Sequence, residues 1–214
     1  MFVANRMAKN PITISAEARV DDAMAMMKRS KVRRLPVVEE GRLVGFLTRQ
    51  DLAAVAPSPA TTLSKYEISA LLGKILVKDV MSTNIVSIKS DATIEEAALL
   101  MAQNKIGSLP VVSEVGAVVG IITDTDVFRT FVDIMGLAEG KTRITLNVDD
   151  KVGVIEGIAG IFAAEGLNID SLVTCNKGNG KYEILIRGDF PDVEGVNEKL
   201  KQHGYDVIHS VRIG

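Results

Sequence analysis

A glycine followed by two hydrophobic residues, a threonine and, three residues later, an aspartate occurs twice in this chain of 214 residues. Thr48 precedes Asp51, and Thr123 precedes Asp126, each time at the end of a G-hydrophobic-hydrophobic-T-x-x-D sequence. A hydroxyl and a carboxylate at this spacing can hold a polar ligand by hydrogen bonds. The same pair has the spacing of a helix-capping box, although Asp is a less usual partner there than Glu. The two interpretations are compatible.

Arginines gather around the first of these motifs only. Arg33 and Arg34 precede its strands, and Arg49 directly follows Thr48. A guanidinium group forms forked hydrogen bonds with phosphate oxygens, so these side chains are candidate phosphate ligands. The alternative, that they are only surface charge, remains open. The matching positions of the second motif are Gly107, Ser108 and Asp124.

Both motifs belong to an internal repeat, in which the run at 33–51 returns at 107–126 and Met7 matches Met81. A stripe of apolar residues at helical spacing precedes each run. The stripes are Val20, Ala23, Met24 and Met27, then Ile94, Ala97, Ala98 and Met101. Each copy is therefore predicted to form a short strand, a helix, two strands and a final helix. Two copies packed sheet to sheet could bury a core that one copy could not.

From residue 142 onward the pattern changes to βαββαβ, which is typical of a ferredoxin-like unit. We therefore predict an α/β (α+β) fold with a pseudo-symmetric pair followed by a different unit. The predicted segments are 1–56 for the first copy, 57–76 for a connector and helix, 77–135 for the second copy, and 141–214 for the last unit. Within the connector, Ser64 and Glu67 form a capping box for a helix at 64–76.

The repeat resembles the tandem CBS domain pair, a widespread sensor of adenosine-containing ligands, over roughly the first 135 residues. The resemblance implies that the aspartate of each motif accepts hydrogen bonds from both ribose hydroxyls, and that the threonine reaches the ribose or first phosphate. It also places adenine beside the first strand of each copy. AMP, ADP or ATP is the expected ligand, and no cofactor is expected. The implied nucleotide-binding residues are Thr13, Arg33, Arg34, Thr48, Asp51, Ser87, Ser108, Thr123 and Asp126.

The last unit is similar to the ACT domain, through the D-x-x-G after its first strand and F-A-A-E-G-L-N-I at 162–169. That family binds amino acids and similar effectors, commonly at paired-domain interfaces. The resemblance implies an effector loop lined by Asp150, Gly153 and Asn168. Alternatively, Gly153 only starts a helix and Asn168 only makes a turn. A CBS pair followed by an ACT domain is similar to the acetoin-utilisation B-type regulatory proteins.

Composition argues against several other classes of protein. The net charge of −2 gives no reason to expect a nucleic-acid or membrane partner. The single cysteine, Cys175, excludes an intramolecular disulfide, and His203 and His209 are interpreted as structural. The stretch at 136–142 imitates a phosphate loop but has three residues between its glycines and leads into a strand. With no leader-like N-terminus or membrane-length apolar run, we expect a cytoplasmic protein.

The favoured function is therefore regulatory and not enzymatic, since no nucleophile–base pair, metal cluster or phosphate loop is evident. We expect an adenine nucleotide at the CBS pair, an amino-acid effector at the ACT domain, and output through a partner protein that the sequence does not identify. A homodimer is expected, because the ACT sheet would otherwise leave one face bare. The alternative is a structural dimerisation module with vestigial pockets.

Overall fold

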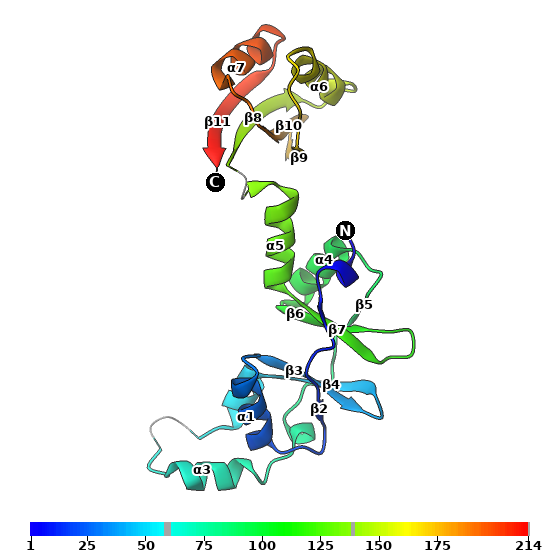
Figure 1. The fold of residues 1–214 in the computed structure, drawn as a ribbon, viewed down its shortest axis with the longest axis vertical. Helices are drawn as coiled ribbons and strands as arrows, with labels where there is room; N and C mark the ends of the chain where they lie inside the picture. The colour runs from blue at the N-terminus through cyan, green and yellow to red at the C-terminus, as the bar shows by residue number, and fades with distance from the viewer. Residues whose placement is uncertain (58–60, 138–139, 214) are drawn as a thin grey trace. The chain divides into compact units, whose positions relative to one another are not determined.

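The structure, a computed structural model, describes residues 1–57, 61–137 and 140–213. Parts of three predicted segments lie outside the described residues, namely 58–60 of the connector, 138–139 of the rejected phosphate loop and residue 214 of the last unit. The chain divides into two compact units, residues 1–127 and 128–214 (Figure 1). The division falls within helix α5 (Asp124–Ile134).

The first copy of the repeat forms a three-stranded sheet with helices packed against it. Strand β2 runs parallel to β3, and β3 pairs antiparallel with β4. The predicted helical stripe is buried in this core except at Met24, which is 38% exposed. The elements are β2 (Ile14–Ser15), α1 (Val20–Arg29), β3 (Arg34–Glu39), β4 (Arg42–Thr48) and α2 (Arg49–Val55).

The second copy repeats this arrangement around its own core, which includes Ile94, Ala97 and Met101 of the second predicted stripe. Its elements are β5 (Ile88–Lys89), α4 (Ile94–Asn104), β6 (Ser108–Val112), β7 (Val118–Thr123) and α5. Helix α3 (Lys65–Leu72) comes before it and has the predicted capping box of Ser64 and Glu67. This helix ends earlier than predicted.

The segment that leads each copy packs against the other copy. This exchange was not part of the predicted fold. Strand β1 (Ala8–Lys9) pairs antiparallel with β7 of the second copy, and the short helix η1 (Val3–Asn5) places Val3 in the second core. In the same way η2 (Val77–Asp79) places Val77 in the first core. These backbone pairs satisfy amide groups that the short sheets would otherwise leave open.

The glycine of the repeated motif makes this exchange possible. A Cβ atom on Gly45 would lie 2.1 Å from Sδ of Met81, and one on Gly120 would lie 2.4 Å from Sδ of Met7. The methionine that leads each copy thus packs directly on the glycine of the other. The match between Met7 and Met81 in the sequence therefore reflects a shared contact.

The second unit has the predicted ferredoxin-like fold, with four antiparallel strands in the order β11-β8-β10-β9. Apolar residues of α6 and α7 pack on the same sheet face as Ile144, Leu146, Ile184 and Ile186. The elements are β8 (Lys141–Asp149), α6 (Val154–Ala164), β9 (Ser171–Gly178), β10 (Lys181–Gly188), α7 (Val193–Gln202) and β11 (Asp206–Ile213).

Candidate nucleotide site between the repeats

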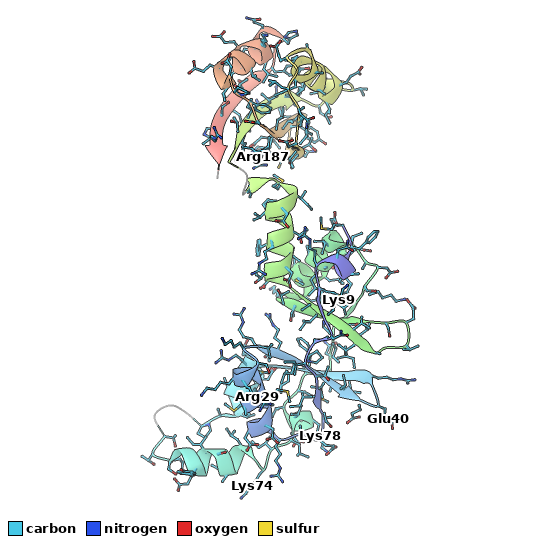
Figure 2. All side chains as sticks on the ribbon, in the orientation of Figure 1. Lys9, Arg29, Glu40, Lys74, Lys78 and Arg187 are labelled. Atoms are coloured by element: carbon cyan, nitrogen blue, oxygen red, sulfur yellow. The ribbon has the colours of Figure 1, made fainter. Side chains whose placement is uncertain are left out.

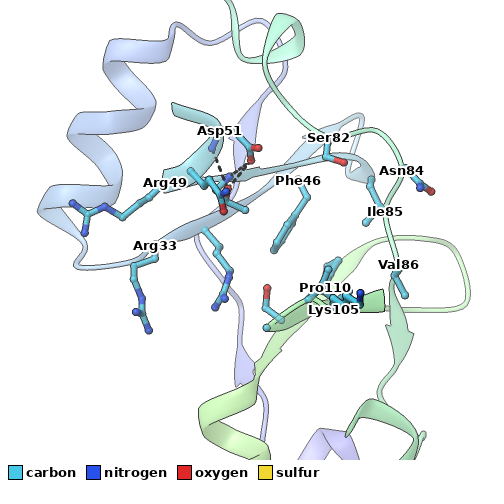
Figure 3. A pocket seen from close by; sticks show the side chains of 16 residues that line it. Arg33, Phe46, Arg49, Asp51, Ser82, Asn84, Ile85, Val86, Lys105 and Pro110 are labelled. Carbon is cyan, nitrogen blue, oxygen red and sulfur yellow. Dashed lines mark hydrogen bonds between the residues drawn. The ribbon is translucent and has the colours of Figure 1, made fainter. Parts of the chain in front are cut away.

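A cavity of about 450 Å³ lies between the two copies of the repeat within the first unit (Figure 3). The first copy contributes the ends of β4 and the start of α2, and the second contributes the segment before β5 and the turn between α4 and β6. This volume falls within the range of small-molecule sites. The exchange of leading segments creates the cavity, because it brings residues 82–86 against the first copy.

Asp51 makes the predicted helix cap and still has hydrogen-bonding capacity left. Its Oδ2 accepts from the Thr48 backbone N–H and from the Thr48 hydroxyl, each at 2.7 Å. The Asp51 N–H donates in return to Thr48 Oγ1 at 3.2 Å. The other carboxylate oxygen has no hydrogen bond to any residue that the structure describes. Capping therefore occupies one oxygen and leaves the second for a ligand.

The repeated pair Thr123 and Asp126 forms the same local arrangement. Asp126 Oδ2 accepts from the Thr123 N–H at 2.9 Å and from its hydroxyl at 2.7 Å. The capping interpretation is thus correct for both copies, and Asp serves there as Glu96 does for α4. A cap alone does not discriminate between a binding role and a purely structural one.

Arg33 and Arg49 lie on one side of the cavity, and Phe46, Ile85, Val86 and Pro110 lie on the other, where Lys105 is next to Pro110 (Figure 3). Arg34 also lines the cavity. A Cβ atom on Gly107 would lie 2.8 Å from Nη2 of Arg34 and 2.7 Å from Oδ2 of Asp124, so Arg34 reaches the second copy through space that only glycine leaves. The apolar side is formed by Phe46, Ile85, Val86 and Pro110.

The cavity collects five of the predicted nucleotide-binding residues, namely Arg33, Arg34, Thr48, Asp51 and Ser108. It does not include Thr13, Ser87, Thr123 or Asp126. In place of Ser87, the second copy presents residues 84–86 just before it. Applying the repeat to the cavity, we infer that Thr123 and Asp126 face the segment around Thr13 on the pseudo-symmetric side.

Sequence reasoning missed Phe46, Ser82, Asn84 and Lys105 as lining residues. Lys105 follows α4 with a left-handed φ of 54°, and Lys31 follows α1 in the same way with 55°. The sequence shows only that the two lysines occupy matching positions of the repeat, which does not place Lys105 in a cavity, since Lys31 does not line this one. Ser82 and Asn84 gave no signal either, because their position depends on the exchanged segment.

The structure does not bring the three predicted ACT effector residues together within one copy. Asp150 and Gly153 lie before α6, whereas Asn168 lies after it, and a helix of 11 residues is about 16 Å long. Gly153 has a φ of +90° where α6 starts, which favours glycine. Asn168 Nδ2 donates to Asp170 Oδ1 at 3.3 Å. Both residues thus have local structural roles.

Two absences apply to the described part of the chain. Within it, no group of three or more His, Cys, Asp or Glu side chains could hold a metal ion. Nor is any helix in residues 1–57, 61–137 or 140–213 long and apolar enough to cross a membrane.

Comparison with protein families matches the CBS domain to residues 3–58 and 77–133, and the ACT domain to residues 142–204. The CBS match covers more than half of the chain. The chain belongs to the CBS domain family, as a tandem pair with a C-terminal ACT domain.

The inosine-5'-monophosphate dehydrogenase of Korarchaeum cryptofilum is 35% identical over 120 residues, or 56% of this chain. The match spans only 22% of the length of that dehydrogenase.

Solved structures resemble the CBS pair. A putative acetoin utilization protein (AcuB) from Vibrio cholerae has a TM-score of 0.53 and 30% identity, covering 65% of this chain and 96% of its own. The structure of CBSX2 in complex with AMP has a TM-score of 0.52 and 29% identity, covering 62% of this chain and 97% of its own. The CBS domain pair of protein MJ0100 was solved in complex with 5'-methylthioadenosine and S-adenosyl-L-methionine. It has a TM-score of 0.52 and 26% identity, covering 62% of this chain and 97% of its own. Adenosine is common to these ligands.

Proposed function

We propose that this protein is a non-catalytic regulator that binds an adenine nucleotide in the cavity between its CBS repeats. The observation that carries the proposal is the carboxylate of Asp51, which lines the cavity and has one oxygen unused by the helix cap. A ribose has two neighbouring hydroxyl groups, and such an oxygen can accept hydrogen bonds from them. The structures solved with AMP and with adenosine derivatives support the same ligand class.

The chemistry of the cavity matches the three parts of a nucleotide. The apolar side with Phe46 and Pro110 suits a base, because aromatic and apolar surfaces stack on its faces. Asp51 lies between this side and the arginines (Figure 3). Arg33 and Arg49 can form forked hydrogen bonds with phosphate oxygens. Base, ribose and phosphate would thus lie in this order across the cavity.

Calorimetric titration of the purified protein with AMP, ADP and ATP tests this proposal. Saturable binding supports regulation, whereas no binding of any of the three favours the structural dimerisation module. Release of phosphate from the bound nucleotide would instead indicate an enzyme. We propose an amino-acid effector at the ACT domain and a regulated partner protein as further parts of this function, testable by titrating amino acids and by pull-down with and without nucleotide.

A further inference from the structure

Two arginines lie next to each other on the ACT sheet, on the face opposite the helices. Side chains alternate between the faces of a strand. Because Ile184 and Ile186 pack under α6 and α7, Arg187 points to the other face. Arg187 is directly opposite Arg143 of β8 in the strand register. Figure 2 shows Arg187 on this side of the sheet.

This pairing is costly as it stands. Like charges directly opposite in neighbouring strands destabilise a sheet. Arg187 is only 5% exposed, and a buried charge without a counter-ion carries a large desolvation penalty. Burial lowers the pKa of the Arg187 guanidinium, and the charge of Arg143 lowers it further. Buried polar side chains in native structures rarely lack a hydrogen-bond partner, so this arginine pair needs an explanation.

The hydrogen bonds of the two guanidinium groups are incomplete. Arg143 Nε donates to the hydroxyl of Thr145 at 3.1 Å. Arg187 Nη1 contacts only the sulfur of Met135 at 3.9 Å, and its buried Nε has no hydrogen-bond partner among the described residues. Sulfur is a weak acceptor, so the Arg187 guanidinium remains largely unsatisfied.

No carboxylate of the described residues forms an ion pair with either arginine. Asp170 directly precedes β9, the strand that pairs with Arg187 of β10, but both of its carboxylate oxygens already have other partners. Its Oδ2 pairs with Lys141 at 2.7 Å, and its Oδ1 accepts from Asn168. The positive charge of the pair is therefore not neutralised from within this part of the chain.

We propose that Arg143 and Arg187 together bind the carboxylate or phosphate group of a small organic anion on this face of the ACT sheet. Two guanidinium forks on adjacent strands can hold one oxyanion from both sides. Arg143 is half-buried and gives access from solvent. Met135, which contacts Arg187, has a flexible side chain that can move aside, and the half-buried Val173 and Leu185 offer an apolar neighbour for the rest of the molecule.

This site is separate from the CBS cavity and from the predicted effector loop at Asp150 and Gly153. An anion would convert the repulsion between the two arginines into a stabilising interaction.

Arginine side-chain NMR of the full chain tests the proposal directly. The Nε–H signals of Arg143 and Arg187 are followed while sodium phosphate or sodium butyrate replaces sodium chloride at constant ionic strength. We expect a saturable shift with phosphate, with butyrate or with both, and the arm that saturates defines the anion class. Shifts that change linearly with all three salts would overturn the proposal.

Three variants complete the test. Arg143→Met should weaken the binding of the anion about tenfold or more, which is the loss expected when one charge-assisted pair of hydrogen bonds is removed. The bound anion should also raise the melting temperature of the wild-type protein, and Arg187→Met should abolish this rise. Arg212→Met removes an exposed arginine of β11 and should bind as wild type does. Arg143→Met keeps the buried Arg187 in place, so its result does not depend on whether Arg187→Met folds. Unchanged binding by Arg143→Met would contradict the proposal. An equal loss of binding in Arg212→Met would contradict it as well.

Discussion

At the scale of single residues, the carboxylate of Asp51 has a structural role and, in the function that we propose, a binding role as well. One oxygen caps α2 through Thr48, and the other is open to a ligand in the cavity. The geometry is therefore compatible with both interpretations of the motif, the helix cap and the ligand site. The sequence motif alone could not show this, because which carboxylate oxygen makes the cap and which stays open depends on how the side chain is placed.

We predict that Asp51→Ala weakens AMP binding by roughly 2–4 kcal/mol, or about thirty- to several-hundred-fold, because two ribose hydroxyls lose a charged acceptor. Calorimetry measures the affinity. The matched control is Glu96→Ala, which removes an equivalent capping box from α4, outside the cavity. If both variants bind AMP as wild type does, the aspartate is only a cap.

A second residue-scale prediction concerns Asp149, whose pKa is lowered from 3.8 to about 2, first by the hydrogen bond from Lys181 and then by Lys151. The interaction with the ionised carboxylate is complete above its ordinary pKa and is lost as pH falls through about 2. Carbon-detected NMR titration should give this low midpoint, and Lys181→Met should raise it. A wild-type midpoint near 3.8 would disprove the shift.

At the scale of elements, the sequence predicted the order of helices and strands in both repeats and in the ACT unit. The apolar stripes around Val20 and Ile94 and the capping box at Ser64 made this possible, since they are local signals. The exchange of leading segments was not predicted. Pairing of β1 with β7 is a tertiary choice, and nothing near Ala8 in the sequence identifies the partner strand.

The same limit explains what was missed in the site. Asp51 and the arginines lie in the repeated motif, so they could be selected by type and spacing. Asn84 and Lys105 reach the cavity only because the second copy packs against the first. Thr13 and Ser87 were placed by resemblance, whereas the cavity uses the residues just before Ser87.

We predict that Gly45→Ala destabilises the first unit by about 1–3 kcal/mol, the usual cost of overpacking. The new methyl group would lie 2.1 Å from Sδ of Met81. Thermal or denaturant unfolding measures the loss. A second change, Met81→Ala, should cost less in the Gly45→Ala background than in wild type, because the clash is then relieved. Strictly additive losses would show that the methionine contact is not the cause.

At the scale of the whole molecule, we expect a homodimer. Exposed apolar side chains support it, among them Leu99 of α4 at 57% exposure, and Phe128 and Phe131 of α5 at 69% and 54%. Apolar residues at such positions favour association with a second copy. Light scattering should give twice the chain mass of 23.0 kDa. A monomer at micromolar concentration would contradict this expectation.

The repeat also predicts two nucleotide sites of unequal character. Arginines occupy three positions around the first motif, where the second motif has Gly107, Ser108 and Asp124. Because Arg34 approaches Gly107 and Asp124, its charge can act near either site, but the inequality remains. Each added phosphate brings charge that an arginine stabilises and a carboxylate opposes.

The most direct test of nucleotide binding at this cavity is a calorimetric titration of AMP, ADP and ATP into wild type and into an Arg33→Ala/Arg34→Ala variant. We predict two unequal sites in wild type, one of which gains affinity with each added phosphate, and a loss of that gain in the variant. No saturable binding of any nucleotide, two identical sites, or the same phosphate dependence in the variant would contradict the account.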